Sequence, residues 1–155
     1  IKKARPFLDG NEPFLVHNAD ILSDINLAEL YRHHRESNAE ATLLVSQRQT
    51  SRYLLLDDVN RLHGWINKST GETKPEGFSF QERQYKKMAF GGIHVISPSL
   101  FRYMESRQWE GKFSIIPFYL SVCETACIQG YPLQDRRWFD IGKPETLAKA
   151  EEYYR

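Results

Sequence analysis

The sequence predicts an α/β fold with a mixed, mainly parallel sheet that is flanked by helices and extended by a small β-hairpin. Apolar runs of strand length alternate with segments of helical period along the 155 residues. Residues 13–18 and 41–46 are two such runs around one helical segment, the pattern of a βαβ unit with a right-handed crossover. Residues 53–56 and 62–66 flank a polar turn, which predicts the hairpin.

The length and composition are those of a single domain. A chain with 41% hydrophobic and 26% charged residues is long enough for one sizeable core and short for two. Its 21 basic and 20 acidic side chains give a net charge of +1, which disfavours a nucleic-acid-binding surface. No apolar run has the length of a membrane span, and the first residues lack the apolar core of a signal peptide. We therefore expect no nucleic acid and no membrane as partners, and a cytoplasmic location.

The remaining helices and strands are predicted from capping residues, prolines and the spacing of apolar residues. Helices are expected where a capping residue or a proline precedes apolar positions at helical spacing, and these starts are Ser23 or Asp24, Ser97, Ser114 and Pro144. Further strands are expected at residues 88–96 and 127–132. Residues 67–87 are polar and predict a long loop, of the kind that is often functional in a compact domain.

Two aspartates follow short apolar or aromatic runs. Asp20 comes just after the first strand, and Asp140 follows Trp138 and Phe139 directly before a helix start. In open α/β sheets, ligands bind outside the carboxyl ends of the strands, so two carboxylates brought together there can hold one divalent cation against a phosphate. An Asp in either position can also be a plain turn residue or helix cap. The pair favours the metal site over that alternative.

The expected strand at residues 88–96 carries Gly91 and Gly92 in its middle. Glycine weakens a strand interior, and the usual reason for it is a bulge or a close approach of the backbone to a ligand. His94 and His17 are the histidines nearest to these features, but neither has an orienting partner close in sequence. We therefore expect His94 to be a packed or surface residue, and we expect no protein nucleophile.

Five segments in this order resemble the sugar-phosphate nucleotidyltransferases, in particular the bacterial branch of muramate and mannose sugar-1-phosphate enzymes. The segments are Phe14-Leu15-Val16-His17-Asn18-Ala19-Asp20, Glu72-Thr73-Lys74-Pro75, Ala89-Phe90-Gly91-Gly92-Ile93-His94-Val95, Gly111-Lys112-Phe113-Ser114-Ile115-Ile116 and Trp138-Phe139-Asp140-Ile141-Gly142-Lys143-Pro144-Glu145-Thr146-Leu147. The resemblance covers nearly the whole chain. It implies a Rossmann-like fold of the nucleotide-diphospho-sugar transferase type.

The resemblance also implies roles for single residues. Asp20 and Asp140 would jointly bind Mg²⁺ and serve catalysis. Gly91, Gly92 and Asn18 would bind substrate, the glycines through their backbone at the sugar.

One basic residue carries over less directly. Lys74 would meet the sugar-1-phosphate, although the motif has one extra residue here, at Thr73. Lys143 stands where the family more often has a threonine.

The implied reaction transfers a nucleoside monophosphate from a nucleoside triphosphate (NTP) to a sugar-1-phosphate and releases pyrophosphate. The family's glycine-rich nucleotide loop has no counterpart before Phe14. We therefore expect the chain to be the C-terminal portion of a longer nucleotidyltransferase domain, inactive alone and able to form homo-oligomers. The alternatives are a glycosyltransferase that uses a nucleotide-sugar, whose usual Asp-x-Asp pattern is not met around Asp20, and a non-catalytic regulatory or interaction domain.

Overall fold

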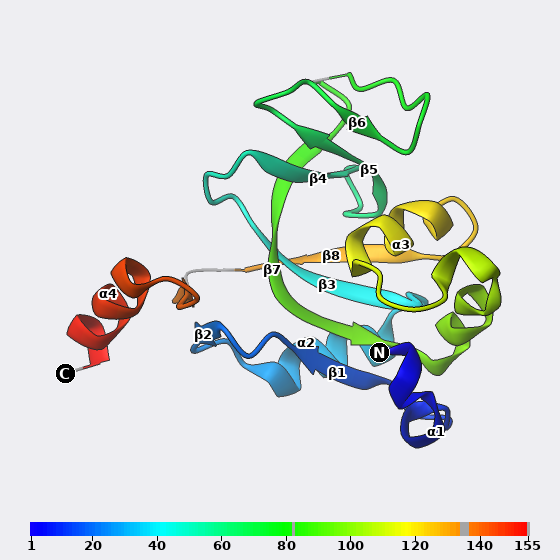
Figure 1. Ribbon diagram of the computed structural model, residues 1–155, viewed down its shortest axis with the longest axis horizontal. Coiled ribbons are helices and arrows are strands. Elements are labelled where there is room, and N and C mark those ends of the chain that lie inside the picture. Colours follow the sequence, from blue (N-terminus) through cyan, green and yellow to red (C-terminus); the bar gives the residue numbers. More distant parts are fainter. Residues whose placement is uncertain (82, 134–136, 155) are drawn as a thin grey trace.

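The computed structural model describes residues 1–81, 83–133 and 137–154 and has an α/β architecture (Figure 1). Its strands are β1 (Phe14–His17), β2 (Ile21–Ser23), β3 (Ala41–Ser46), β4 (Arg52–Leu56), β5 (Leu62–Asn67), β6 (Thr73–Lys74), β7 (Lys86–Ile96), β8 (Ile128–Pro132) and β9 (Trp138–Asp140). Its α-helices are α1 (Arg5–Leu8), α2 (Leu27–Glu36), α3 (Ile115–Val122) and α4 (Pro144–Tyr154), and its 3₁₀ helices are η1 (Lys2–Ala4), η2 (Pro98–Glu105) and η3 (Arg107–Trp109). None of the helices in the described ranges has the length and apolar character needed to cross a bilayer.

The predicted mixed sheet with flanking helices is confirmed, but the prediction that it is mainly parallel is wrong. The strands follow the order β6-β5-β4-β7-β3-β8, and β1 also pairs with β7. Among the described pairings only β3 with β8 is parallel. The βαβ interpretation gives β1 and β3 the same direction, which the structure shows, but β7 lies between them and is antiparallel to both.

The predicted hairpin is present as β4 and β5, and it forms part of an extension of the sheet. β7 is long enough to pair with β1 and β3 through one end and with β4 through the other. In Figure 1 this strand curves from the lower layer up to the hairpin. The expected loop at 67–87 is interrupted by β6, which pairs with β5, so the excursion is a three-stranded layer on β7.

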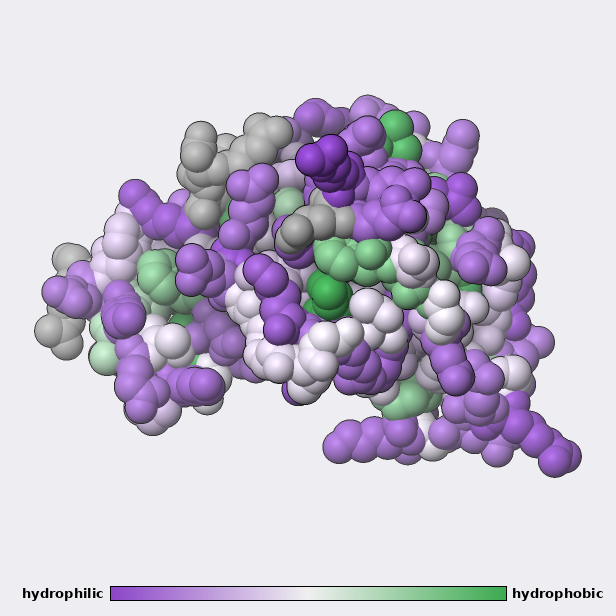
Figure 2. All heavy atoms as spheres, turned by 90° about the horizontal axis from the view of Figure 1, so that it is seen from above, coloured by the Kyte–Doolittle hydropathy of each residue, from purple (hydrophilic) through white to green (hydrophobic). Residues whose placement is uncertain are grey.

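Both faces of β3, the strand next to β7 in the sheet, are buried, as expected for a strand that is apolar almost throughout. Alternate residues of β3 enter two clusters, because side chains of a strand point to opposite faces. Leu43 and Val45 pack with Phe118 and Tyr119 of α3, whereas Leu44 packs with Leu30 of α2. The face shown in Figure 2 is mainly hydrophilic, with apolar residues in small groups.

The helices are close to the predicted places. α2 begins after Asn26, whose side chain accepts a hydrogen bond from the backbone amide of Glu29, so the cap lies slightly later than Ser23 or Asp24. The element after Ser97 is a 3₁₀ helix with Pro98 in its first turn. α4 lies at the edge of the molecule in Figure 1, in contact with β9.

Candidate functional site

The two predicted aspartates are brought together by a small sheet that the sequence did not predict. β2 pairs antiparallel with β9, and Ile21 lies opposite Asp140. The amide of Ile141 donates to the carbonyl oxygen of Asp20 at 2.8 Å. Asp20 precedes β2 and Asp140 ends β9, so the two carboxylates emerge at the same end of this ribbon.

Gly142 shows how close the two carboxylates are. A Cβ atom at Gly142 would lie 3.2 Å from Oδ1 of Asp140 and 3.4 Å from Oδ2 of Asp20. Both oxygens therefore face one point, which the missing side chain leaves open. The amide of Gly142 also donates to Oδ1 of Asp140 at 3.1 Å and fixes that carboxylate.

The donor set of this pair fits magnesium. Mg²⁺ takes oxygen ligands and retains several water molecules, so it is often held by one or two carboxylates together with substrate phosphates. Asp20 and Asp140 are exposed, which leaves room for such further ligands. Within the described ranges, no cluster of three or more His, Cys, Asp or Glu side chains forms a fuller metal cage.

The Gly91-Gly92 pair forms a bulge, one of the two reasons expected for glycines in this strand, and the bulge lies against the residues before Asp20. The register between β3 and β7 shifts between Leu43 and Val45, opposite the two glycines. Gly92 has φ +74° and its carbonyl accepts from the amide of Asn18 at 2.9 Å. A Cβ atom there would lie 3.1 Å from Nδ2 of Asn18, so glycine is required both by the backbone conformation and by the space.

β9 is held to the same bulge from its other side. Nε1 of Trp138 donates to the carbonyl of Gly91 at 2.7 Å. The predicted residues therefore form one connected group, carried by the turn between β1 and β2, by β7 and by β9: Asn18, Asp20, Gly91, Gly92 and Asp140.

An arginine that the sequence analysis missed packs on this group. The Arg48 guanidinium lies over the Trp138 ring, with Cζ 4.4 Å from the ring centroid, and its Nη2 donates to the carbonyl of Phe90 at 3.2 Å. Desolvation at this position lowers the pKa of Arg48, while the Asp140 carboxylate acts on it in the opposite direction. Arginine stays protonated at neutral pH in any case.

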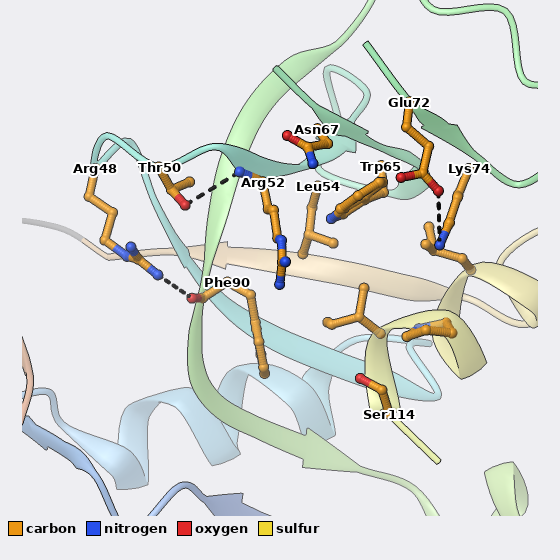
Figure 3. A pocket seen from close by; sticks show the side chains of 13 residues that line it. Arg48, Thr50, Arg52, Leu54, Trp65, Asn67, Glu72, Lys74, Phe90 and Ser114 are labelled. Carbon is orange, nitrogen blue, oxygen red and sulfur yellow. Dashed lines mark hydrogen bonds and ion pairs between the residues drawn. The ribbon is translucent and has the colours of Figure 1, made fainter. Parts of the chain in front are cut away.

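Arg48 also lines a pocket of about 490 Å³ beside the group (Figure 3). The hairpin layer forms one wall, and Phe90 and the start of α3 form the other. The predicted substrate residue Lys74 is at the end of the pocket away from Arg48, where its Nζ lies 3.2 Å from Oε1 of Glu72 and 5.3 Å from the centroid of the Trp65 ring.

Three of the lining side chains are cationic and one is acidic: Arg48, Arg52, Lys74 and Glu72. Glu72 is paired with Lys74, so the excess positive charge lies with the two arginines. The Trp65 ring supplies an apolar surface between the arginines and that ion pair. The pocket therefore has the chemistry of a site for a polar ring that carries a negative charge.

No local sequence pattern marks Arg48, Arg52 or Trp65 as residues of the site. They lie in or next to the β4–β5 hairpin, where polar residues are ordinary surface residues. They come together at one cavity only because β4 pairs with both β5 and β7.

The structure places His94 in the core. His94 is buried, and its Nδ1 lies 2.6 Å from the hydroxyl oxygen of Tyr119. Burial lowers the pKa of His94 to about 4. Of the two expectations for His94, a packed or a surface residue, the structure shows the packed one.

Comparison with known proteins decides the family. The profile described as "Nucleotidyl transferase" matches residues 1–155. The chain belongs to this nucleotidyl transferase family. Among curated relatives, a probable mannose-1-phosphate guanylyltransferase 3 of Arabidopsis thaliana is 24% identical over 94% of the chain and 40% of its own length. A mannose-1-phosphate guanylyltransferase catalytic subunit beta of Danio rerio is 25% identical over 90% of the chain and 35% of its own length.

Solved structures support the same fold. A putative glucose-1-phosphate thymidylyltransferase from Bacillus anthracis matches with a TM-score of 0.72 at 14% identity, over 99% of this chain and 58% of that one. A UTP-bound UGPase from Acinetobacter baumannii matches with a TM-score of 0.73 at 16% identity, over 99% and 54%. This nucleotidyl transferase chain spans well under half the length of these curated relatives and just over half the length of these solved structures.

Proposed function

We propose that this chain is the metal-binding and sugar-phosphate-binding part of an enzyme that joins an NTP and a sugar-1-phosphate to give a nucleotide-sugar and pyrophosphate. The observation that carries the proposal is the pairing of β2 with β9, which turns the carboxylates of Asp20 and Asp140 to one point beside a cationic pocket. The family assignment and the names of the relatives agree with it. That assignment also disfavours a glycosyltransferase.

Asp20 and Asp140 would hold Mg²⁺, which supplies charge neutralisation for phosphate oxygens. The chain's own residues then provide positioning, the main requirement of phosphoryl chemistry. The pocket would bind the sugar between Trp65 and Phe90, the residue that directly precedes the Gly91-Gly92 bulge. This orients an oxygen of the sugar-1-phosphate toward the α-phosphorus of the NTP, where the new P–O bond forms as pyrophosphate leaves.

The pocket is also of suitable size, because ligand cavities of about 300–1,000 Å³ are usual for small molecules. Lys74 would lie at the sugar end of the pocket. There Lys74 and Glu72, which form an ion pair, would together hydrogen-bond the hydroxyl groups of the sugar. The cytoplasmic location and the homo-oligomer stay predictions. The resemblance to the bacterial branch also leads us to propose a role in making cell-wall or polysaccharide precursors in bacteria.

The test is pyrophosphate release by the full-length protein that contains this sequence, with Mg²⁺ present. Pairs to compare include GTP with mannose-1-phosphate and UTP or dTTP with glucose-1-phosphate. We expect turnover with at least one pair and a loss of a hundredfold or more in Asp20→Asn and in Asp140→Asn, because each removes a charged metal ligand. Asp58→Asn is the matched control, since Asp58 is exposed and lies in the β4–β5 turn. Turnover that survives in both site variants would refute the proposal.

A further inference from the structure

Arg48 is an exposed arginine at the wall of the pocket, and most of its hydrogen-bond donors are open to a ligand. Only one hydrogen bond of its guanidinium is made within the described part of the chain, to the carbonyl of Phe90. A guanidinium has five N–H donors in a planar fork. The cation–π contact with Trp138 holds the guanidinium at the wall of the pocket, where its remaining donors can reach a ligand.

The position of Arg48 between the two halves of the site is the second observation. It lines the pocket, and it is also close enough to Asp140 for that carboxylate to influence its charge. Yet no hydrogen bond or ion pair joins Arg48 to Asp140 or Asp20 among the residues that the structure describes. Arg48 therefore lies near enough to Asp140 to interact with it electrostatically, without a direct ion pair between the two.

Resting on the proposed function, we infer that Arg48 binds the phosphate of the sugar-1-phosphate and holds it against the carboxylate-bound cation. Negative and positive charges would then alternate across the site, in the order carboxylates, cation, phosphate and guanidinium. Arginine suits this position because its planar fork can bind two phosphate oxygens at once while its face stays stacked on an indole. A lysine would supply charge without either geometric constraint.

This assignment also sets the direction of the ligand in the pocket. The phosphate lies at the Arg48 end, and the sugar ring extends past Arg52 toward Trp65. The Glu72–Lys74 pair then meets the hydroxyl groups at the far end. Figure 3 shows these side chains in that order along the cavity.

A purely structural role for Arg48 makes a different prediction. Arg48 joins β9, through Trp138, to β7, through Phe90, so it could serve only as a clamp that keeps Asp140 in place. Loss of a clamp would weaken binding of both the cation and the sugar phosphate. If Arg48 instead binds the phosphate, its positive charge also repels the cation. Its loss would then lower the affinity for the sugar phosphate and leave the affinity for the cation equal or higher.

The experiment measures both affinities in the full-length protein, with Arg48→Gln and Arg48→Lys beside the wild type. Mn²⁺ binding is followed by electron paramagnetic resonance in the absence of ligand, and binding of the best sugar-1-phosphate substrate by calorimetry with Mg²⁺ present. Arg35→Gln is the matched control, because Arg35 is an exposed arginine on α2 with a long ion pair of 3.8 Å to Glu12.

We expect Arg48→Gln to raise the dissociation constant for the sugar-1-phosphate about 10- to 100-fold, the usual effect of losing charge-assisted hydrogen bonds to phosphate. Arg48→Lys should recover part of this loss. The Mn²⁺ dissociation constant should stay the same or fall. If Arg48→Gln lowers the affinity for Mn²⁺ as much as the affinity for the sugar phosphate, Arg48 is a structural clamp and the inference is overturned. An unchanged affinity for the sugar phosphate would also overturn it. A wild-type protein that binds no sugar-1-phosphate would instead refute the proposed function itself.

Discussion

Replacement of Gly92 by alanine tests how tightly the bulge is built against the residues around Asp20. Two costs add at this position. The φ of +74° is disfavoured for a residue with a Cβ, by about 1–2 kcal/mol. The new methyl group would also lie 2.8 Å from Cγ1 of Ile21 and 3.1 Å from Nδ2 of Asn18, and such overpacking costs about 1–3 kcal/mol. We expect Gly92→Ala to lower the free energy of unfolding by about 2–5 kcal/mol, from the two ranges together.

Gly71→Ala is the matched control for this change. Gly71 has φ +75°, but a Cβ there would meet nothing within 4 Å, so only the backbone cost of about 1–2 kcal/mol remains. The assay is urea denaturation of both variants beside the wild type, with pyrophosphate release measured in parallel. Ile21 directly follows Asp20, so Gly92→Ala should also reduce turnover, whereas Gly71→Ala should not. Equal loss of stability in the two variants would refute the close packing of the bulge on Asn18 and Ile21.

Two further predictions concern the hydrogen bonds and histidines around the site. Trp138→Phe keeps a ring under Arg48 but removes the 2.7 Å hydrogen bond to the Gly91 carbonyl. We therefore expect the free energy of unfolding to fall by about 1–3 kcal/mol and turnover to decrease. An unchanged melting temperature together with unchanged kinetics would contradict this. Burial lowers the pKa of His94 and of His34 to about 4, from an ordinary value near 6.5. The unfolded chain therefore binds more protons between these values, and stability present above pH 6.5 is lost as the pH falls toward 4. From pH 7.5 to 5.5, where few carboxylates titrate, each histidine should remove about 1 kcal/mol, and a flat denaturation midpoint over that range would count against their burial.

The parts of this fold that the sequence predicted depend on local pattern. The first strand and its arrival at Asp20 follow from an apolar run that stops at Asn18, and the bulge follows from two adjacent glycines in a strand. The β4–β5 hairpin follows from two apolar runs around a polar turn. In each case the signal lies within about ten residues, the range over which periodicity and turn residues act.

The parts that were missed depend on pairing between distant segments. β2 and β9 have three residues each, too few for a periodic signal, and their contact joins opposite ends of the chain. β7 lies between β1 and β3, so these two strands pair with β7 and not with each other. The local sequence of β1 and of β3 carries no sign of this. The role of Arg48 depends on both events, because it needs Trp138 on β9 and Phe90 on β7 at once.

The central claim is that Asp20 and Asp140 share one divalent cation, and Mn²⁺ binding to the full-length protein tests it most directly. The structure predicts that the wild type binds Mn²⁺ at this site, that Asp20→Asn and Asp140→Asn each abolish that binding, and that Asp58→Asn retains it. Binding of Mn²⁺ that is unchanged in both site variants would contradict the account, because the two carboxylates would then face one another for a reason other than a shared metal ion.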